Sequence, residues 1–359
     1  MLKLFENAIE PGRVTSVHRL RWLALLLLAL SLAAFAQSNA GVGIAAITVT
    51  DPVGDGKMPG FVFYPSTQPT PDTTAIGPYN VAAAFDANQQ VGPKPLVVIS
   101  HGHGGGNLGH HDLATFLAGH GFIVATLEHP KDNFRDKTGD GHAEVMYGRP
   151  IQVSATIDAL IHDPRWTKSI DPDRIGVAGF SAGGYTSLMI VGAVPRFDRF
   201  IGYCERHPDD VENCGTVKRL GARGTKKALA ALQNDLRRWG DTADPRVKAA
   251  FAMAPQSISF DKSGAAAIDR PVFLYYGEND QVLLPSENAL HLKPLINTPT
   301  EIRMVPNADH WVFLAPCSPE LAKDVKDICS DPPGVDRAEV HRQVNADALA
   351  FFRKTLGAP

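Results

Sequence analysis

A serine flanked by glycines is the residue in this sequence with the clearest capacity for chemistry. It is Ser181, in the motif Gly-Phe-Ser-Ala-Gly at 179–183, which follows an apolar run at 175–179 and precedes a run of helical character. In such a strand–turn–helix context the glycines permit a tight turn that projects the hydroxyl away from the core, and the next helix points its N-terminus at the reacting oxygen. We predict that Ser181 is a nucleophile. The alternative is an ordinary glycine-rich turn.

A nucleophilic serine needs a histidine that removes its proton and an acid that orients the histidine. After a turn of this type both follow along the chain, the acid first. The apolar run at 272–276 leads to Glu278 and Asp280, and the run at 301–305 leads into a loop that contains Asp309 and His310. We predict Asp280 as the acid and His310 as the base. Glu278 is the alternative acid, Asp309 is a weaker one because a neighbour of the base rarely reaches its ring, and a surface-loop role is the alternative for His310.

Acyl transfer also requires donors for the oxyanion of the tetrahedral intermediate, usually two backbone N–H groups. The residue after the nucleophile, Ala182, is one candidate. The second donor is expected in the glycine-rich loop at 101–106, which follows the apolar run at 96–100. Within that loop we predict the backbone N–H of His103.

Histidines at 101, 103, 110 and 111 could instead suggest a metal site. No carboxylate or cysteine accompanies them in a recognised ligand spacing, so we favour the oxyanion loop and predict no metal. The segment at 136–141 hints at a calcium loop but lacks the closing glutamate of an EF-hand, and a solvated turn is the better interpretation.

Apolar runs that alternate with helical patterns must position these residues. Continuously apolar strands of this kind predict a mostly parallel sheet with helices on both faces. The expected strands are 44–50, 61–64, 96–100, 122–127, 175–179, 247–253, 272–276 and 301–305, and the expected helices are 112–119, 151–162, 182–191 and 342–356. The stretch at 65–93, rich in Pro, Thr, Ala and Gly, is expected to be a long surface loop.

An insertion at about 196–244 follows the helix after Ser181. Leu229, Leu232, Leu236 and Trp239 recur there at helical spacing. Packing against the domain is one interpretation, and a lid over the substrate pocket is the other, because ligands bind above the strand ends. Tyr185 and Trp311 are candidate pocket residues, although each fits an ordinary core or surface position.

Composition and the N-terminus bound the class of protein. The chain has 359 residues, 35 Lys plus Arg against 38 Asp plus Glu, and a net charge of −3, so nucleic acid is not an expected partner. Basic residues precede an apolar run at 22–36 that ends in small residues, which predicts a signal peptide at 1–36 cleaved after Ala36 or Ala40 and a single domain at 41–359. An uncleaved membrane anchor is the alternative. No cysteine follows the run, so a lipoprotein anchor is not expected.

The cysteines fit an exported protein. Cys204 and Cys214 lie close in sequence, as do Cys317 and Cys329, and export would expose both pairs to oxidising conditions. We predict two local disulfides and a secreted or periplasmic location. Four unpaired thiols are the alternative that the sequence leaves open.

With these pieces placed, the chain resembles the predicted dienelactone hydrolases and the platelet-activating-factor acetylhydrolase-like esterases of the α/β-hydrolase superfamily. The matching stretches are 95–104, 117–125 with Glu128 and His129, 179–184, 277–280 and His310. The resemblance covers the chain from about residue 44 onward and is loosest in the insertion. It implies an α/β-hydrolase fold with the triad and oxyanion donors named above. True dienelactone hydrolases use a cysteine nucleophile, so the serine favours simple carboxylic esters.

We therefore predict a serine carboxylic ester hydrolase that forms an acyl-enzyme on short-chain or aryl esters and needs no cofactor. Its expected partner is a small-molecule ester, with no stable membrane span after signal cleavage. A peptidase or amidase with the same triad is the alternative within enzymes, and a non-catalytic binding protein with this fold is the alternative from another class. The natural substrate and the oligomeric state stay open.

Overall fold

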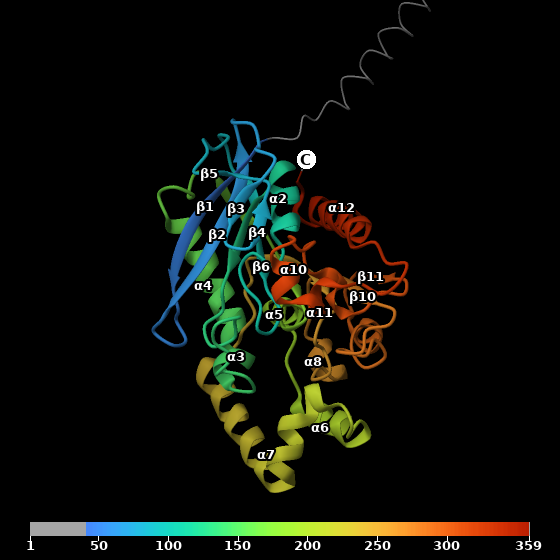
Figure 1. Cartoon of the computed structure of the whole chain (residues 1–359). Coiled ribbons are helices and arrows are strands. Elements are labelled where there is room, and N and C mark those ends of the chain that lie inside the picture. Colours follow the sequence, from blue (N-terminus) through green and yellow to red (C-terminus); the bar gives the residue numbers. More distant parts are fainter. Residues whose placement is uncertain (1–40, 359) are drawn as a thin grey trace, which may run out of the picture. The chain divides into compact units, whose positions relative to one another are not determined.

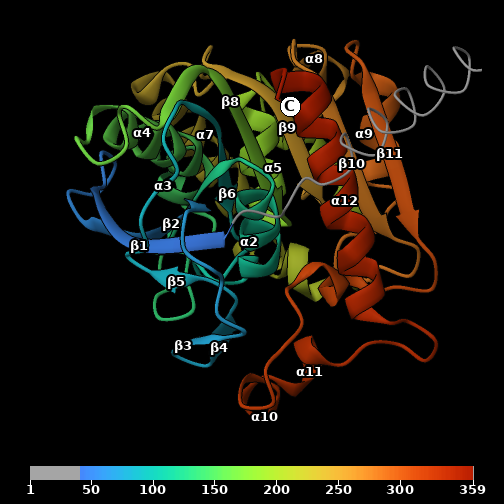
Figure 2. The same ribbon diagram turned by 90° about the horizontal axis from the view of Figure 1, so that it is seen from above.

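Strand β8 (Ile170–Phe180), which ends one residue before Ser181, lies inside a nine-stranded sheet of the computed structural model. The structure describes residues 41–358. The strand order is β11-β10-β9-β8-β6-β7-β2-β1-β5. Figures 1 and 2 show β1 and β2 at one edge of this sheet and β10 and β11 at the other. The other bounds are β1 (Gly41–Thr50), β2 (Lys57–Ser66), β5 (Ala84–Phe85), β6 (Lys94–Ser100), β7 (Ile123–Leu127), β9 (Val247–Met253), β10 (Val272–Gly277) and β11 (Thr300–Val305).

The neighbouring strands β7, β6, β8, β9, β10 and β11 all run parallel to one another, and β2 runs antiparallel to both β1 and β7. In the register between β6 and β8, Ser100 pairs with Gly179. The carboxyl ends of the parallel strands therefore meet at one edge, which is where ligands bind in such sheets.

Helices cover both faces of the sheet, as predicted. One apolar core, called the main core below, contains residues of α4 (Gly148–His162) and α5 (Ala182–Ile190). The other contains residues of α2 (His111–Gly119) and α12 (Arg337–Leu356). The central strands read as unbroken apolar runs because both of their faces are buried. Shorter helices connect these elements: α3 (Ala143–Met146), α8 (Lys262–Ala265), α9 (Ala289–Leu292), η1 (Lys293–Leu295), η2 (His310–Phe313), α10 (Leu321–Asp324) and α11 (Lys326–Cys329).

Several expectations about element boundaries were wrong, including the starts of β2 and β8, which begin at Lys57 and Ile170 instead of 61 and 175. The segment at 65–93 is not one long loop, because it contains a hairpin of β3 (Thr74–Ile76) and β4 (Tyr79–Val81) and the short edge strand β5. Strands of two or three residues are too short for an apolar period to reveal them. Helix α12 begins at Arg337 rather than 342, where the Asp336 side chain accepts a hydrogen bond from the Glu339 N–H and caps the first turn.

The insertion forms α6 (Phe197–Arg206) and α7 (Val211–Trp239), which Figure 1 shows together near α3 and α8. Gly221 adopts φ 62° inside α7 and divides it into two helical pieces. The apolar stripe at 229, 232, 236 and 239 packs against the main core. The packing interpretation is therefore confirmed for this part of the insertion, and a lid role stays a prediction.

Both predicted disulfides, Cys204–Cys214 and Cys317–Cys329, are confirmed. The predicted signal peptide lies outside the described residues. Between residues 41 and 358 no helix combines the length and the apolar character needed to cross a membrane.

Candidate active site

Ser181 occupies a strained turn between β8 and α5. Its backbone adopts φ 55° and ψ −115°, a region that L-residues rarely enter and that is retained mainly at functional sites. The turn is held from β9, because the Ser181 N–H donates to the Met253 carbonyl at 3.0 Å and the Gln256 N–H donates to the Ser181 carbonyl at 3.0 Å. Gly183 is needed here, since a Cβ at this position would lie 1.9 Å from the Ser100 carbonyl oxygen.

The predicted acid and base are in direct contact. Nδ1 of His310 lies 2.7 Å from Oδ2 of Asp280, and both side chains are 1% exposed. The other carboxylate oxygen of Asp280 accepts from the N–H groups of Val282 at 2.9 Å and Leu283 at 2.7 Å. These bonds fix the carboxylate, and a carboxylate in this position favours the imidazole tautomer with its proton on Nδ1.

The two alternative acids are used elsewhere. Oε2 of Glu278 accepts from the backbone N–H of Asn307 at 2.8 Å. Asp309 caps η2 by accepting from the Trp311 N–H at 3.0 Å, and burial raises the pKa of its carboxyl. The structure therefore brings Asp280 to His310.

Phe180 links the serine turn to the histidine. Its ring centroid lies 4.7 Å from that of His310, and Phe180 immediately precedes Ser181. Between residues 41 and 358 the Ser181 hydroxyl makes no hydrogen bond, and neither does Nε2 of His310. In ligand-free enzymes such bonds are often long and shorten only when substrate binds.

The glycine-rich loop approaches the serine turn closely. A Cβ on Gly102 would lie 3.0 Å from the Phe180 ring and 3.4 Å from Cβ of Ser181. Within the described part of the chain the backbone N–H groups of His103 and Ala182 donate no hydrogen bond. The two N–H groups predicted as oxyanion donors are thus free to bind a ligand oxygen.

The histidines of this region have separate roles. His101 and His110 are fully buried, and burial lowers their pKa values to about 3 and about 4, so both are neutral at physiological pH. Half-exposed His103 pairs with Asp132, whose hydrogen bond raises the pKa of the imidazole. His111 packs edge-on against Tyr79. Among residues 41–358 no group of three or more His, Cys, Asp or Glu is placed to hold a metal.

Of the two candidate pocket residues, Tyr185 lies in the apolar core, which is the alternative given for it above. Its side chain is 2% exposed and stacks on Phe260 at 5.3 Å, so the apolar core explains it. The sequence left this open because α5 has only small, apolar and hydroxyl side chains and no charged face that would mark its solvent side. Trp311 is half-buried, and its ring lies edge-on 5.1 Å from that of His310. It stays a candidate pocket residue.

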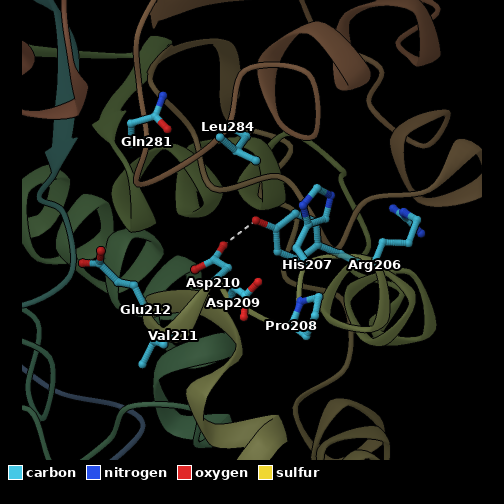
Figure 3. A pocket seen from close by; sticks show the side chains of 10 residues that line it. Arg206, His207, Pro208, Asp209, Asp210, Val211, Glu212, Gln281 and Leu284 are labelled. Carbon is cyan, nitrogen blue, oxygen red and sulfur yellow. Dashed lines mark hydrogen bonds between the residues drawn. The ribbon is translucent and has the colours of Figure 1, made fainter.

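Two hollows lie near the carboxyl edge of the sheet. One has a volume of about 540 Å³. It lies between the α6–α7 turn and the loop after β10, where Gln281 directly follows Asp280 (Figure 3). Its walls carry mixed charges, including Arg206, Asp209 and Glu212. The other, of about 280 Å³, is largely apolar and adjoins the glycine-rich loop. It is lined by Pro59, Phe61, Ile76, Gly77, Pro78, Tyr79, Gly106, Asn107, Leu108, Glu128, Phe134 and Arg135.

The side chains that support the glycine-rich loop were not predicted from the sequence. Asp132 accepts from the Gly104 N–H at 3.1 Å, and Arg149 of α4 pairs with the same carboxylate. The Arg149 side chain is 1% exposed in the structure, and no feature of its local sequence indicates this. Burial cannot be read from a single charged residue.

Comparison with solved structures identifies the fold. No protein-family model matches the chain. The ferulic acid esterase from Streptomyces cinnamoneus is 19% identical over 90% of this chain and 92% of its own, with a TM-score of 0.61. A puromycin-hydrolyzing peptidase from Mycobacterium tuberculosis (16% identity, 88% of this chain and 39% of that chain, TM-score 0.49) and a dienelactone hydrolase from Anabaena variabilis (14%, 87% and 98%, 0.47) are more distant. The chain has the α/β-hydrolase fold, as the resemblance implied.

Proposed function

We propose that the chain is a serine carboxylic ester hydrolase that works through an acyl-enzyme on Ser181. The observation that carries the proposal is the buried 2.7 Å contact between His310 and Asp280, with the ring of Phe180, the residue before Ser181 in its strained turn, packed on the His310 ring. A fold alone does not specify a reaction, whereas this combination of groups suits acyl transfer.

In acylation, Oγ of Ser181 attacks the ester carbonyl carbon while its proton passes to Nε2 of His310. The carbonyl electrons move onto oxygen, where the N–H groups of His103 and Ala182 stabilise the negative charge. When the intermediate collapses, the bond from carbon to the leaving oxygen breaks and that oxygen takes the proton from His310. Asp280 stabilises the imidazolium throughout.

In deacylation, water attacks the acyl carbon and gives a proton to His310. The second tetrahedral intermediate then expels Oγ, which recovers that proton, and the carboxylic acid is released. The atoms balance as one ester plus one water to one acid plus one alcohol, so the reaction requires no cofactor.

The apolar hollow beside the glycine-rich loop supports an aryl ester as substrate. Phe134 is 60% exposed on its wall, and the Phe134 N–H donates to the Gly105 carbonyl at 2.9 Å, in the same loop as the oxyanion donor His103. An exposed aromatic side chain in an apolar hollow favours a planar apolar group. The name of the fold neighbour, ferulic acid esterase, suggests the same ester class to test first.

The two disulfides support an oxidising location, and with the predicted signal peptide they lead us to propose secretion or a periplasmic location.

Labelling with a fluorophosphonate, followed by assay of p-nitrophenyl and aryl esters, tests the proposed activity. The wild type should be labelled and should hydrolyse esters, Ser181→Ala should do neither, and the control Ser263→Ala should behave like the wild type. Folded wild type that is neither labelled nor active on any ester would exclude the proposal. Cleavage of amides in preference to esters would support the peptidase alternative instead.

A further inference from the structure

Two buried opposite charges lie behind the glycine-rich loop. Nη1 of Arg149 is 2.5 Å from Oδ2 of Asp132, and both side chains are 1% exposed. Transfer of two charges into the interior is costly, and such a pair is weak evidence for stability because apolar residues of similar size often stabilise as well. A role in specifying one local geometry is therefore the better explanation.

The second oxygen of Asp132 holds the loop itself. Oδ1 accepts from the Gly104 backbone N–H at 3.1 Å and lies 2.6 Å from Nδ1 of His103. The Asp132 carboxylate thus contacts both residues joined by the 103–104 peptide bond, the side chain of His103 and the backbone N–H of Gly104. Gly104 adopts φ 62°, a left-handed conformation that glycine takes at little cost, and the Gly105 N–H also donates to the Gly102 carbonyl at 3.0 Å across this turn.

Arg149 forms hydrogen bonds with the beginning of the same loop. Its Nη2 donates to the His101 carbonyl and, at 3.2 Å, to Oγ of Ser100. Residues 100, 101, 103 and 104 are therefore tied to one ion pair. Arg149 comes from α4, so the pair connects the loop to a helix that packs in the main core.

Beneath the loop, the uncharged side chains of Ser100, His129 and Gln152 are connected by hydrogen bonds. Nε2 of His129 lies 2.9 Å from Oγ of Ser100, and its Nδ1 lies 2.7 Å from Oε1 of Gln152. Ser100 and His129 are fully buried, so this second serine–histidine contact cannot reach a substrate. Its position satisfies the polar groups beneath the loop.

We propose that Asp132, supported by Arg149, is a positioning residue. Asp132 holds the 103–104 peptide and the His103 side chain while Arg149 holds the 101–102 peptide, and together they orient the 102–103 peptide between them so that its His103 N–H faces the developing oxyanion. Asp132 acts through the backbone and does not touch the substrate. The inference rests on the proposed function, because it assumes an acyl-transfer oxyanion at this site. An oxyanion-hole donor is effective only when it is held in place before the reaction.

The test compares Asp132→Ala and Asp132→Asn with Asp244→Asn. Asp244 is also buried and paired with an arginine, since its carboxylate lies 2.6 Å from Arg246. It precedes β9 and therefore lies at the amino ends of the parallel strands, away from the carboxyl ends where the candidate site is. Each folded variant is assayed for kcat and KM on p-nitrophenyl acetate and for its rate of fluorophosphonate labelling. Circular dichroism and thermal midpoints report folding.

Asp132→Ala should lower kcat by about 100-fold and Asp132→Asn by about 10-fold, with KM within about twofold of the wild type, because a transition-state contact is lost. The smaller effect of Asn follows from its amide oxygen, which can still accept from Gly104. Labelling should slow in parallel. Asp244→Asn should change the thermal midpoint but leave kcat within about twofold.

Folded Asp132 variants with kcat near that of the wild type would overturn the proposal, as would a rise in KM with unchanged kcat. If Asp132→Ala does not fold, the kcat of Asp132→Asn decides, and failure of both to fold would assign the pair to folding instead of positioning. Wild type that is neither labelled nor active would reject the proposed function itself, a result that these variants do not affect.

Discussion

The ring of Phe180 packs against the ring of His310, with 4.7 Å between their centroids. Because such aromatic contacts contribute about 0.5–1.5 kcal/mol, loss of this one should let the imidazole leave its productive orientation part of the time. We predict that Phe180→Leu lowers kcat by about 2- to 10-fold with little change in KM, as measured by steady-state ester hydrolysis.

Phe352→Leu is the matched control for that experiment. Phe352 is fully buried in the core of α2 and α12, where it contacts Phe122 and Phe251, and its substitution should lower stability without slowing turnover. Equal kcat values for the Phe180 variant and the wild type would contradict a supporting role for the Phe180 ring.

His341 should make stability depend on pH. Its Nδ1 lies 2.6 Å from Oδ2 of Asp112, and its Nε2 lies 2.9 Å from the Val312 carbonyl in the short helix that begins with His310. Burial alone would lower the pKa of His341, but the charge and hydrogen bond of Asp112 outweigh burial and raise it. Burial would raise the pKa of Asp112, and the charge of His341 outweighs this and lowers it.

The two shifts define a pH window. Because the pKa of His341 is raised in the folded state, its contribution to stability is fully present at pH values below the unfolded pKa of about 6.5. This contribution is lost as the pH rises through the folded pKa. Because the pKa of Asp112 is lowered in the folded state, its contribution to stability is fully present at pH values above the unfolded pKa of about 3.9. This contribution is lost as the pH falls through the folded pKa. We predict that His341→Gln costs on the order of 3 kcal/mol at about pH 5.5 and less at about pH 8, as measured by urea unfolding. A cost that is equal at both pH values would show that the pair does not titrate as described.

Phe134 should determine preference for aryl esters. Replacing it with alanine removes an aromatic wall of the apolar hollow, and we predict that KM for a phenyl-bearing ester rises by about 5- to 20-fold, the equivalent of about 1–2 kcal/mol, while KM for p-nitrophenyl acetate changes less. Phe85→Ala, at an exposed position on the edge strand β5, is the control and should leave both values unchanged. Equal effects of Phe134→Ala on both esters would place the aryl group elsewhere.

The order of motifs in the sequence was sufficient to predict the contact between Asp280 and His310. Apolar runs place 277–280 and 305–310 at the carboxyl ends of adjacent parallel strands, and those ends meet at one edge of the sheet. The central strands could also be predicted, because strands that are buried on both faces appear in the sequence as long apolar runs.

Side-chain burial and long-range pairing could not be predicted in this way. Asp132 and Arg149 belong to a loop and a helix that meet only through the fold, and nothing in their local sequence marks them as buried. The sequence left Tyr185 open between a pocket and a core position for a related reason: its helix follows the predicted nucleophile, but its side chain is buried in the core. The short strands of the 65–93 segment depend on pairing with distant residues, such as Ile44 with Phe85.

The acyl-enzyme on Ser181 is the central claim, and peptide mapping by mass spectrometry after rapid acid quench of the enzyme with a p-nitrophenyl ester tests it most directly. The account predicts that the mass of the acyl group appears on the peptide that contains Ser181 and is absent from Ser181→Ala. An adduct on a different residue, or ester turnover by Ser181→Ala at the rate of the wild type, would contradict it.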